Sequence, residues 1–182
     1  EVALWVRDAE PFFPDRVPPR LPNHRIPKDV RISEDLTEFT APIGILAIPT
    51  QALGAALAAE IAPKSETIVS CAKGIDRETQ LLPAELINEN RKHASIAQLT
   101  GPSFADDIAR GLPTALTLAS TDEAMGETLQ HMLSTPELRL YRSNDIIGAS
   151  MGGALKNVIA IAAGAVIGAG LGESARAALI AR

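Results

Sequence analysis

Residues 43–71 read IGILAIPTQALGAALAAEIAPKSETIVSC and set the pattern for much of the chain. Two aliphatic runs, 43–48 and 67–71, predict strands that are buried on both faces of a sheet. Between them, residues 51–61 place apolar side chains at helical spacing and predict a helix. This order indicates two parallel strands connected by a helix that covers the sheet.

The alternation continues with a predicted helix at 79–91 and a strand at 95–99. Further along, we expect a short helix at 104–110, a strand at 115–119, a helix that opens at 121–123 and a strand at 138–141. The pattern predicts an α/β fold with a mostly parallel sheet, as in nucleotide-binding domains. The remainder has helical periodicity, so we expect a dinucleotide-binding domain over residues 1–142 and the start of an all-helical second domain over residues 143–182.

The beginning of the chain has a different pattern. Residues 2–6 predict a strand that stops at the charged pair Arg7–Asp8. Six of the 13 prolines then fall between Pro11 and Pro27. Proline at this density excludes regular helix and predicts an extended connection over the surface.

The composition excludes several kinds of partner. The 17 basic and 22 acidic residues form no basic block, which argues against nucleic acid or an anionic membrane surface as a partner. Cys71 is the only cysteine, so a disulfide framework within the chain is excluded and a reducing cytoplasm is expected. The three histidines lack the spacing of metal ligands, and we expect no metal site.

The stretch from 151 to 171 is apolar except for Lys156 and Asn157, and a membrane span is one interpretation of it. Four glycines between Gly164 and Gly172 favour close helix packing in the core of a soluble protein instead. We therefore expect no insertion into a membrane.

Lys156 is the strongest candidate for chemistry. Leu155, Val158 and Ile159 surround it in the predicted helix, so its ammonium must lose water or find partners. Loss of water would lower its pKa from about 10.4 toward the range in which a general acid or base is most effective. The alternative is a lysine at the edge of the helix whose ammonium reaches solvent.

Further candidates follow the predicted strands. Lys73 comes just after the strand at 67–71, at the carboxyl end where ligands of open α/β sheets bind, although a solvated loop lysine is the commoner explanation of such a sequence. Gly101 and Ser103 follow the next strand, with Ser103 at or near a helix start. Backbone amides and a hydroxyl there could hold a phosphate or a carbonyl oxygen, and simple capping is the alternative. We expect Phe104 to belong to the core.

Two positions are candidates for contact with a nucleotide. An acidic residue after the second strand of a dinucleotide fold would accept the ribose hydroxyls of NAD, whereas Arg7 can pair with the extra phosphate of NADP. Because the acidic Asp8 follows Arg7 directly, the sequence is compatible with either NAD or NADP. Pro49 begins another strand-to-helix junction that could flank the cofactor, and a capped turn explains this junction equally well.

Several segments, in order along almost the whole chain, resemble those of the bacterial NAD(P)-dependent glycerol-3-phosphate dehydrogenases. They are LWVRD at 4–8, IPTQAL at 48–53, CAKGI at 71–75, GPSFADDIARGLPTA at 101–115, GGALKNVIAIAAG at 152–164 and GESARAALIAR at 172–182. The resemblance implies a Rossmann-like domain followed by a helical substrate and dimerisation domain. It also implies a cytoplasmic homodimer that interconverts dihydroxyacetone phosphate, a small phosphorylated triose, and sn-glycerol 3-phosphate for glycerophospholipid synthesis.

The resemblance also implies roles for the candidate residues. Lys156 would donate the proton to the carbonyl oxygen during reduction, and Lys73 would lie between cofactor and substrate and polarise the ketone. The substrate would contact Gly101, Ser103 and, as a weaker expectation, Asn157, while NAD or NADP, with NADPH favoured, would contact Arg7, Pro49, Lys73 and Ala105.

Two features of the family do not occur in this sequence: a G-x-G-x-x-G turn for the pyrophosphate, and the downstream aspartate with its Arg-Asn pair. We expect the first before Glu1 and the second after Arg182. Two other interpretations stay open at this point. One is a related β-hydroxyacid-type dehydrogenase, and the other is a truncated scaffold without catalysis.

Overall fold

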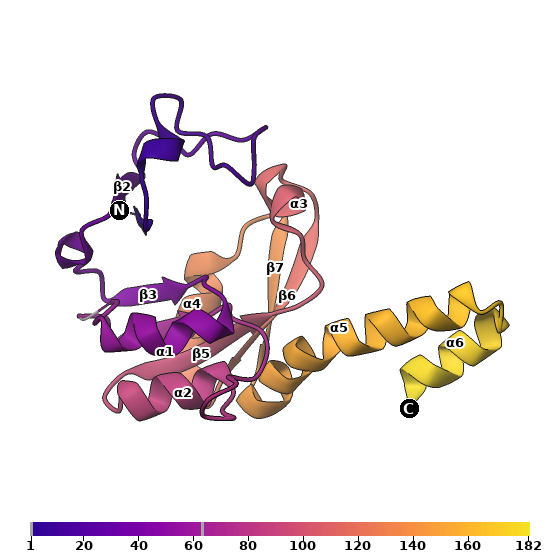
Figure 1. The fold of residues 1–182 in the computed structure, drawn as a ribbon. Coiled ribbons are helices and arrows are strands. Elements are labelled where there is room, and N and C mark those ends of the chain that lie inside the picture. The colour runs from indigo at the N-terminus through magenta and orange to yellow at the C-terminus, as the bar shows by residue number, and fades with distance from the viewer. Residues whose placement is uncertain (1, 63) are drawn as a thin grey trace.

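The computed structural model describes residues 2–62 and 64–182 and contains two sheets (Figure 1). A two-stranded sheet pairs β1 (Ala3–Trp5) with β2 (Arg31–Ser33) in parallel. A five-stranded sheet follows in the order β3-β4-β5-β6-β7. Its strands are β3 (Ile43–Leu46), β4 (Thr67–Ser70), β5 (Ser95–Thr100), β6 (Thr114–Ser120) and β7 (Leu138–Ser143).

The large sheet is mostly parallel and Rossmann-like, as the sequence predicts. The first three strands run in parallel, β6 is antiparallel to β5, and β7 is parallel to β6. The carboxyl ends of β3, β4 and β5 therefore meet at one edge, which we call the carboxyl edge. The short helix α3 (Ala105–Ala109) connects β5 to β6 and begins at this edge.

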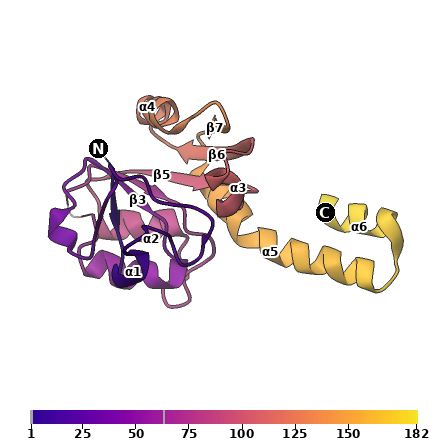
Figure 2. The same ribbon diagram turned by 90° about the horizontal axis from the view of Figure 1, so that it is seen from above.

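Helices cover both faces of the sheet, as the alternating pattern predicts (Figure 2). On one face, α1 (Thr50–Ala58) and α2 (Pro83–Asn90) enclose a core that includes Leu53, Ile68 and Ile87, all three fully buried. On the other face, α4 (Glu123–Leu133) packs over a second core. Because Ile68 and its neighbour Val69 belong to opposite cores, β4 is buried on both faces.

The helix predicted at 79–91 begins later than expected. The carboxylate of Asp76 accepts hydrogen bonds from the backbone N–H and the hydroxyl of Thr79, both at 2.8 Å, and these bonds fold the preceding residues into a turn. Helix α2 then begins at Pro83, whose missing N–H is not needed in a first helical turn. Threonine is common at helix starts, but Thr79 stabilises the turn before α2 instead.

The proline-rich connection contains only a short 3-10 helix, η1 (Glu10–Phe12), and a second one, η2 (Leu36–Glu38), follows β2. Arg16 organises the connection, because its guanidinium donates hydrogen bonds to the carbonyl oxygens of Ile26, Pro27 and Val30. The side chain of His24 then reaches Asp106 in α3, with 3.0 Å between Nε2 and Oδ1. The connection is thus attached to the large sheet near the carboxyl edge.

The carboxyl-terminal region consists of α5 (Ile146–Gly168) and α6 (Gly172–Ala181). The first turns of α5 pack on β5 and β6, and the rest projects away from the sheet beside α6 (Figure 1). By length and composition, α5 could cross a membrane, and 6% of its most apolar window is buried. A Cβ atom at any of the four glycines from Gly164 to Gly172 would meet no other atom within 4 Å, so the close packing expected for them is not found within the described residues.

Candidate active site

Lys73 and Gly101 come together at the carboxyl edge. Lys73 lies three residues beyond the last residue of β4, and Gly101 directly follows β5. The ammonium of Lys73 donates a hydrogen bond of 3.1 Å to the carbonyl oxygen of Gly101. The two strand ends predicted to contribute to one site are thus joined by a direct contact.

Side chains from neighbouring elements hold the loop that carries Lys73. The hydroxyl of Thr50, in the first turn of α1, donates to the carbonyl oxygen of Lys73 at 2.8 Å. Gln98 on β5 donates from Nε2 to the carbonyl oxygen of Ala72 at 3.0 Å. Sequence reasoning missed Gln98, for which the available signal was a polar side chain within an otherwise apolar strand. It placed Thr50 only in the strand-to-helix junction that could flank the cofactor, without this role.

Helix α5 approaches the same edge through Gly153. A Cβ atom added to Gly153 would lie 3.0 Å from Oγ1 of Thr100 and 3.5 Å from Cγ of Lys73. Only a residue without a side chain permits this approach without displacing its neighbours. Lys156 follows three residues later, on the same side of the helix as Gly153. The packing of α5 therefore brings Lys156 toward Lys73.

The ammonium of Lys156 lies 5.8 Å from the centre of the Phe104 ring, within the range of a cation–π contact. Phe104 is 71% exposed, so the prediction that it belongs to the core is wrong. Of the two interpretations of Lys156, the structure bears out the second: its side chain is exposed, as for a lysine at the edge of the helix. The apolar neighbours Leu155 and Val158 are themselves exposed where α5 leaves the sheet.

The charges at this edge influence one another. Partial burial lowers the pKa of Lys73, and the positive charge of Lys156 lowers it further, while Cys71 acts weakly in the opposite direction. Burial raises the pKa of the Cys71 thiol. Two nearby ammonium groups, one of them with a lowered pKa, form a site suited to an anionic ligand and to proton transfer.

The segment from Gly101 to Ala105 forms one wall of this site. Gly101 has a φ of +155°, and a Cβ there would lie 2.8 Å from the side chain of Leu116, so glycine is required. Ser103 is half-buried and close to the helix start, but the N-cap of α3 is Phe104. The expectation of simple capping by Ser103 is therefore not met. Ala105 is the first residue of α3.

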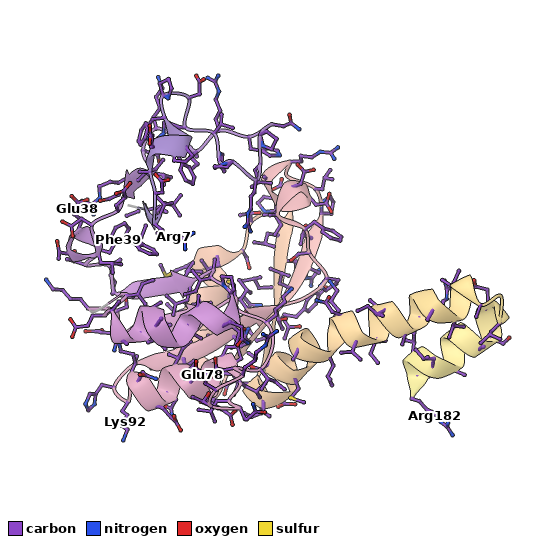
Figure 3. All side chains as sticks on the ribbon, viewed as in Figure 1. Arg7, Glu38, Phe39, Glu78, Lys92 and Arg182 are labelled. Carbon is purple, nitrogen blue, oxygen red and sulfur yellow. The ribbon has the colours of Figure 1, made fainter. Side chains whose placement is uncertain are left out.

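The other predicted site residues do not all lie at the carboxyl edge. Pro49 is the exposed N-cap of α1, next to Thr50 and thus at the carboxyl edge. Asn157 is exposed on α5 beside Lys156. Arg7 follows β1 in the separate two-stranded sheet, and Figure 3 shows it in the amino-terminal part of the molecule, away from α5. The strand before Arg7 is therefore not part of the large sheet in this structure.

Within residues 2–62 and 64–182, no group of three or more His, Cys, Asp or Glu side chains is arranged to hold a metal ion. The described site consists of two amines, a hydroxyl, backbone groups and an exposed aromatic ring. Such a set can bind a small anion and deliver a proton to an oxygen atom.

Family models match both parts of the chain. The model described as the NAD-dependent glycerol-3-phosphate dehydrogenase N-terminus matches residues 1–126, and the corresponding C-terminus model matches residues 145–182. A curated glycerol-3-phosphate dehydrogenase (NAD(P)+) from Jannaschia sp. strain CCS1 is 55% identical over 183 residues, covering 100% of this chain and 58% of the relative. The enzyme of that name from Paracoccus denitrificans is 53% identical over 182 residues, with the same coverage of 100% and 58%.

Solved structures show the same similarity. The crystal structure of glycerol-3-phosphate dehydrogenase from Coxiella burnetii has 29% sequence identity and a TM-score of 0.87, covering 100% of this chain and 58% of that one. The Plasmodium falciparum glycerol-3-phosphate dehydrogenase shares the fold, with a TM-score of 0.88 at 23% identity over 98% of this chain and 53% of that one. This chain thus spans a little over half the length of the proteins that it matches.

Proposed function

This chain belongs to the NAD-dependent glycerol-3-phosphate dehydrogenase family, and we propose that the protein reduces dihydroxyacetone phosphate to sn-glycerol 3-phosphate with NADH or NADPH. The observation that carries the proposal is the approach of Lys156 to Lys73 at the carboxyl edge, where Gly153 packs against the Lys73 side chain. A ligand of an open α/β sheet binds at this edge.

In this proposal, each lysine has its own role. Lys73 lies beside the ketone and polarises its oxygen, and Lys156 delivers the proton to that oxygen as the carbon is reduced. In the reverse direction, Lys156 accepts the proton from the hydroxyl. The positive charges of both ammonium groups also favour binding of the phosphorylated triose. Gly101 and Ser103 would contact the substrate on one side, and Asn157 would support Lys156.

The reduced nicotinamide supplies the hydride when it is bound. Three residues at the carboxyl edge are proposed to contact its nicotinamide end. Pro49 lies between β3 and α1, Lys73 follows β4, and Ala105 begins the helix after β5. Arg7 would pair with the extra phosphate of NADPH, which favours this cofactor. The sequence contains no G-x-G-x-x-G turn, so no residue of this chain is assigned to the pyrophosphate.

The domain organisation follows from the same proposal. Residues 1–142 form the dinucleotide-binding domain, and residues 143–182 begin a helical domain for substrate binding and dimerisation. The apolar side chains exposed along α5, among them Val158 and Ile161, support a homodimer in which this helix is covered. We also propose a cytoplasmic enzyme that provides glycerol phosphate for glycerophospholipids, and the single cysteine, Cys71, fits a reducing compartment.

A comparison of substrates tests the proposal. The full-length protein should oxidise NADPH in the presence of dihydroxyacetone phosphate and should leave NADPH unchanged with a β-ketoacid. Turnover of the β-ketoacid alone would indicate the related β-hydroxyacid-type dehydrogenase. A protein that binds no NADPH in a direct titration would be a scaffold, and the proposal would then be wrong.

A further inference from the structure

The two backbone carbonyl groups on either side of the Lys73 Cα atom are both held by buried side chains. The oxygen of Ala72 accepts a hydrogen bond from Nε2 of Gln98 at 3.0 Å, and the oxygen of Lys73 accepts one from Oγ1 of Thr50 at 2.8 Å. Gln98 and Thr50 are 1% and 3% exposed. Two different elements, β5 and α1, therefore fix the same short segment.

Gln98 is an unusual residue for its position. It lies in the middle of β5, a central strand that is covered on both faces. Its Oε1 atom is buried and has no hydrogen-bond partner among the described residues. A buried amide oxygen without a partner destabilises a fold relative to an apolar side chain of similar size. The other end of the amide makes one clear contact, the bond to Ala72.

The segment that these two side chains hold lies in a loop outside the regular hydrogen bonding of the sheet. It lies beyond the end of β4 and precedes Gly74, whose φ of +121° is accessible to glycine because glycine has no Cβ atom and few steric restraints. Lys73 must nevertheless place its ammonium 3.1 Å from the oxygen of Gly101, close to Lys156. A long side chain reaches a fixed point only if its own backbone is fixed.

We propose that Gln98 and Thr50 are positioning residues that hold the Ala72–Lys73 backbone so that the Lys73 ammonium is fixed between the ends of β4 and β5. This inference rests on the proposed function, since it assigns Lys73 a reacting ketone to act on. Gln98 and Thr50 are both buried, so neither is assigned a contact with the substrate. They act on the reaction through the placement of Lys73, and a displacement of about 1 Å at such a site can lower the rate by roughly 100-fold.

The test uses Gln98→Met, which keeps the size of the side chain and removes its amide. Gln130→Met is a matched control, because Gln130 Nε2 also donates to a backbone carbonyl, that of Leu140 at 2.7 Å, and does so between α4 and β7. Each variant loses one bond of the same kind. Gln98→Met also removes the buried, unpaired Oε1 atom, so it should lower the thermal midpoint of the full-length protein no more than Gln130→Met does.

Two measurements separate positioning from a merely structural role. The first is the pH dependence of Lys73 acetylation, followed by peptide mass spectrometry with the exposed Lys92 as reference (Figure 3). We expect the midpoint for Lys73 to rise in Gln98→Met, because a loosened amine is better solvated, and to stay unchanged in Gln130→Met. The second is turnover, in which kcat should fall by about tenfold or more in Gln98→Met with a smaller change in KM.

The inference is wrong if Gln98→Met and Gln130→Met give the same Lys73 midpoint and the same kcat. Thr50→Val provides a second variant should Gln98→Met fail to fold. It should also raise the acetylation midpoint of Lys73 and lower kcat. If the wild-type protein does not reduce dihydroxyacetone phosphate, the proposed function fails. The acetylation midpoint of Lys73 still decides in that case whether Gln98 positions it.

Discussion

Gly153 of α5 lies directly against Lys73: a Cβ atom on the glycine would be 3.5 Å from Cγ of the lysine. This contact joins the helix that carries Lys156 to the loop that carries the second amine. The distance between the two ammonium groups thus depends on how closely the backbone of α5 can approach the sheet.

Replacing this glycine should separate the helix from the sheet. Gly153→Leu would place a large side chain against Thr100 and Lys73, and we expect it to lower the free energy of unfolding by about 1–3 kcal/mol and to reduce activity strongly. Gly152→Leu is the control, because a Cβ at Gly152 has no neighbouring atom within 4 Å. It should stabilise the helix by about 0.5–1 kcal/mol. Chemical denaturation of both variants checks this, and equal effects would contradict it.

The contact between Phe104 and Lys156 should contribute modestly to the rate. An exposed cation–π contact is worth about 0.5–1 kcal/mol, so Phe104→Leu should lower kcat/KM for dihydroxyacetone phosphate by about two- to fivefold. Phe104→Tyr keeps an aromatic face and should retain most of the activity. Steady-state kinetics of the two variants provide the measurement. A loss of the same size in both would mean that the ring does not act through its face.

The contact between His24 and Asp106 should attach the proline-rich connection to α3. A double-mutant cycle with His24→Ala and Asp106→Ala should give a coupling free energy of about 0.2–1 kcal/mol in chemical denaturation. The pair Arg25–Asp15 is a suitable reference, since both of its side chains are well exposed at a separation of 3.5 Å. Its coupling should be close to zero. Equal coupling in both pairs would show that His24 does not fasten the connection.

Asp76 should make stability depend on pH. Hydrogen bonds from the backbone and hydroxyl of Thr79 lower the pKa of its carboxyl group. Because the pKa is lower in the folded state, the stabilisation is present above the unfolded pKa and is lost as the pH falls through the folded value. The stability difference between wild type and Asp76→Asn should therefore be large near neutral pH and should shrink in acid. Denaturation as a function of pH measures it, with the exposed Asp29→Asn as control, and a difference that stays constant with pH would contradict it.

The strands of the large sheet could be predicted because each carries apolar residues in a short run or in alternation, and hydrophobic periodicity reports burial directly. Only part of the predicted burial is found: β4 is buried on both faces, whereas Ile45 of β3 and Tyr141 of β7 are exposed. Hydrophobic periodicity does not report the direction of a strand, so the antiparallel pairing of β5 with β6 was not predicted. The strand β2 at Arg31–Ser33 was missed for another reason. It is three residues long, only partly buried, and defined by its pairing with distant Ala3–Trp5.

The candidate site was predictable in part for similar reasons. Lys73 and Gly101 could be placed together because both follow strands of one parallel sheet. The exposure of Lys156 and Phe104 depends on where α5 leaves the sheet, and this packing is not visible in local periodicity. Gln98 was missed, and the contact of Thr50 with Lys73 was not foreseen, because the partners of both side chains are backbone carbonyls, which are present at every position of any sequence.

The most direct test is the rate of dihydroxyacetone phosphate reduction by Lys156→Ala in the full-length protein with NADPH. If Lys156 delivers the proton at the carboxyl edge, kcat should fall by roughly 10²- to 10⁴-fold while the variant stays folded. Replacement of the exposed Lys92 by alanine should leave the rate unchanged. A Lys156→Ala enzyme that turns over at nearly the wild-type rate would show that the proton comes from another group.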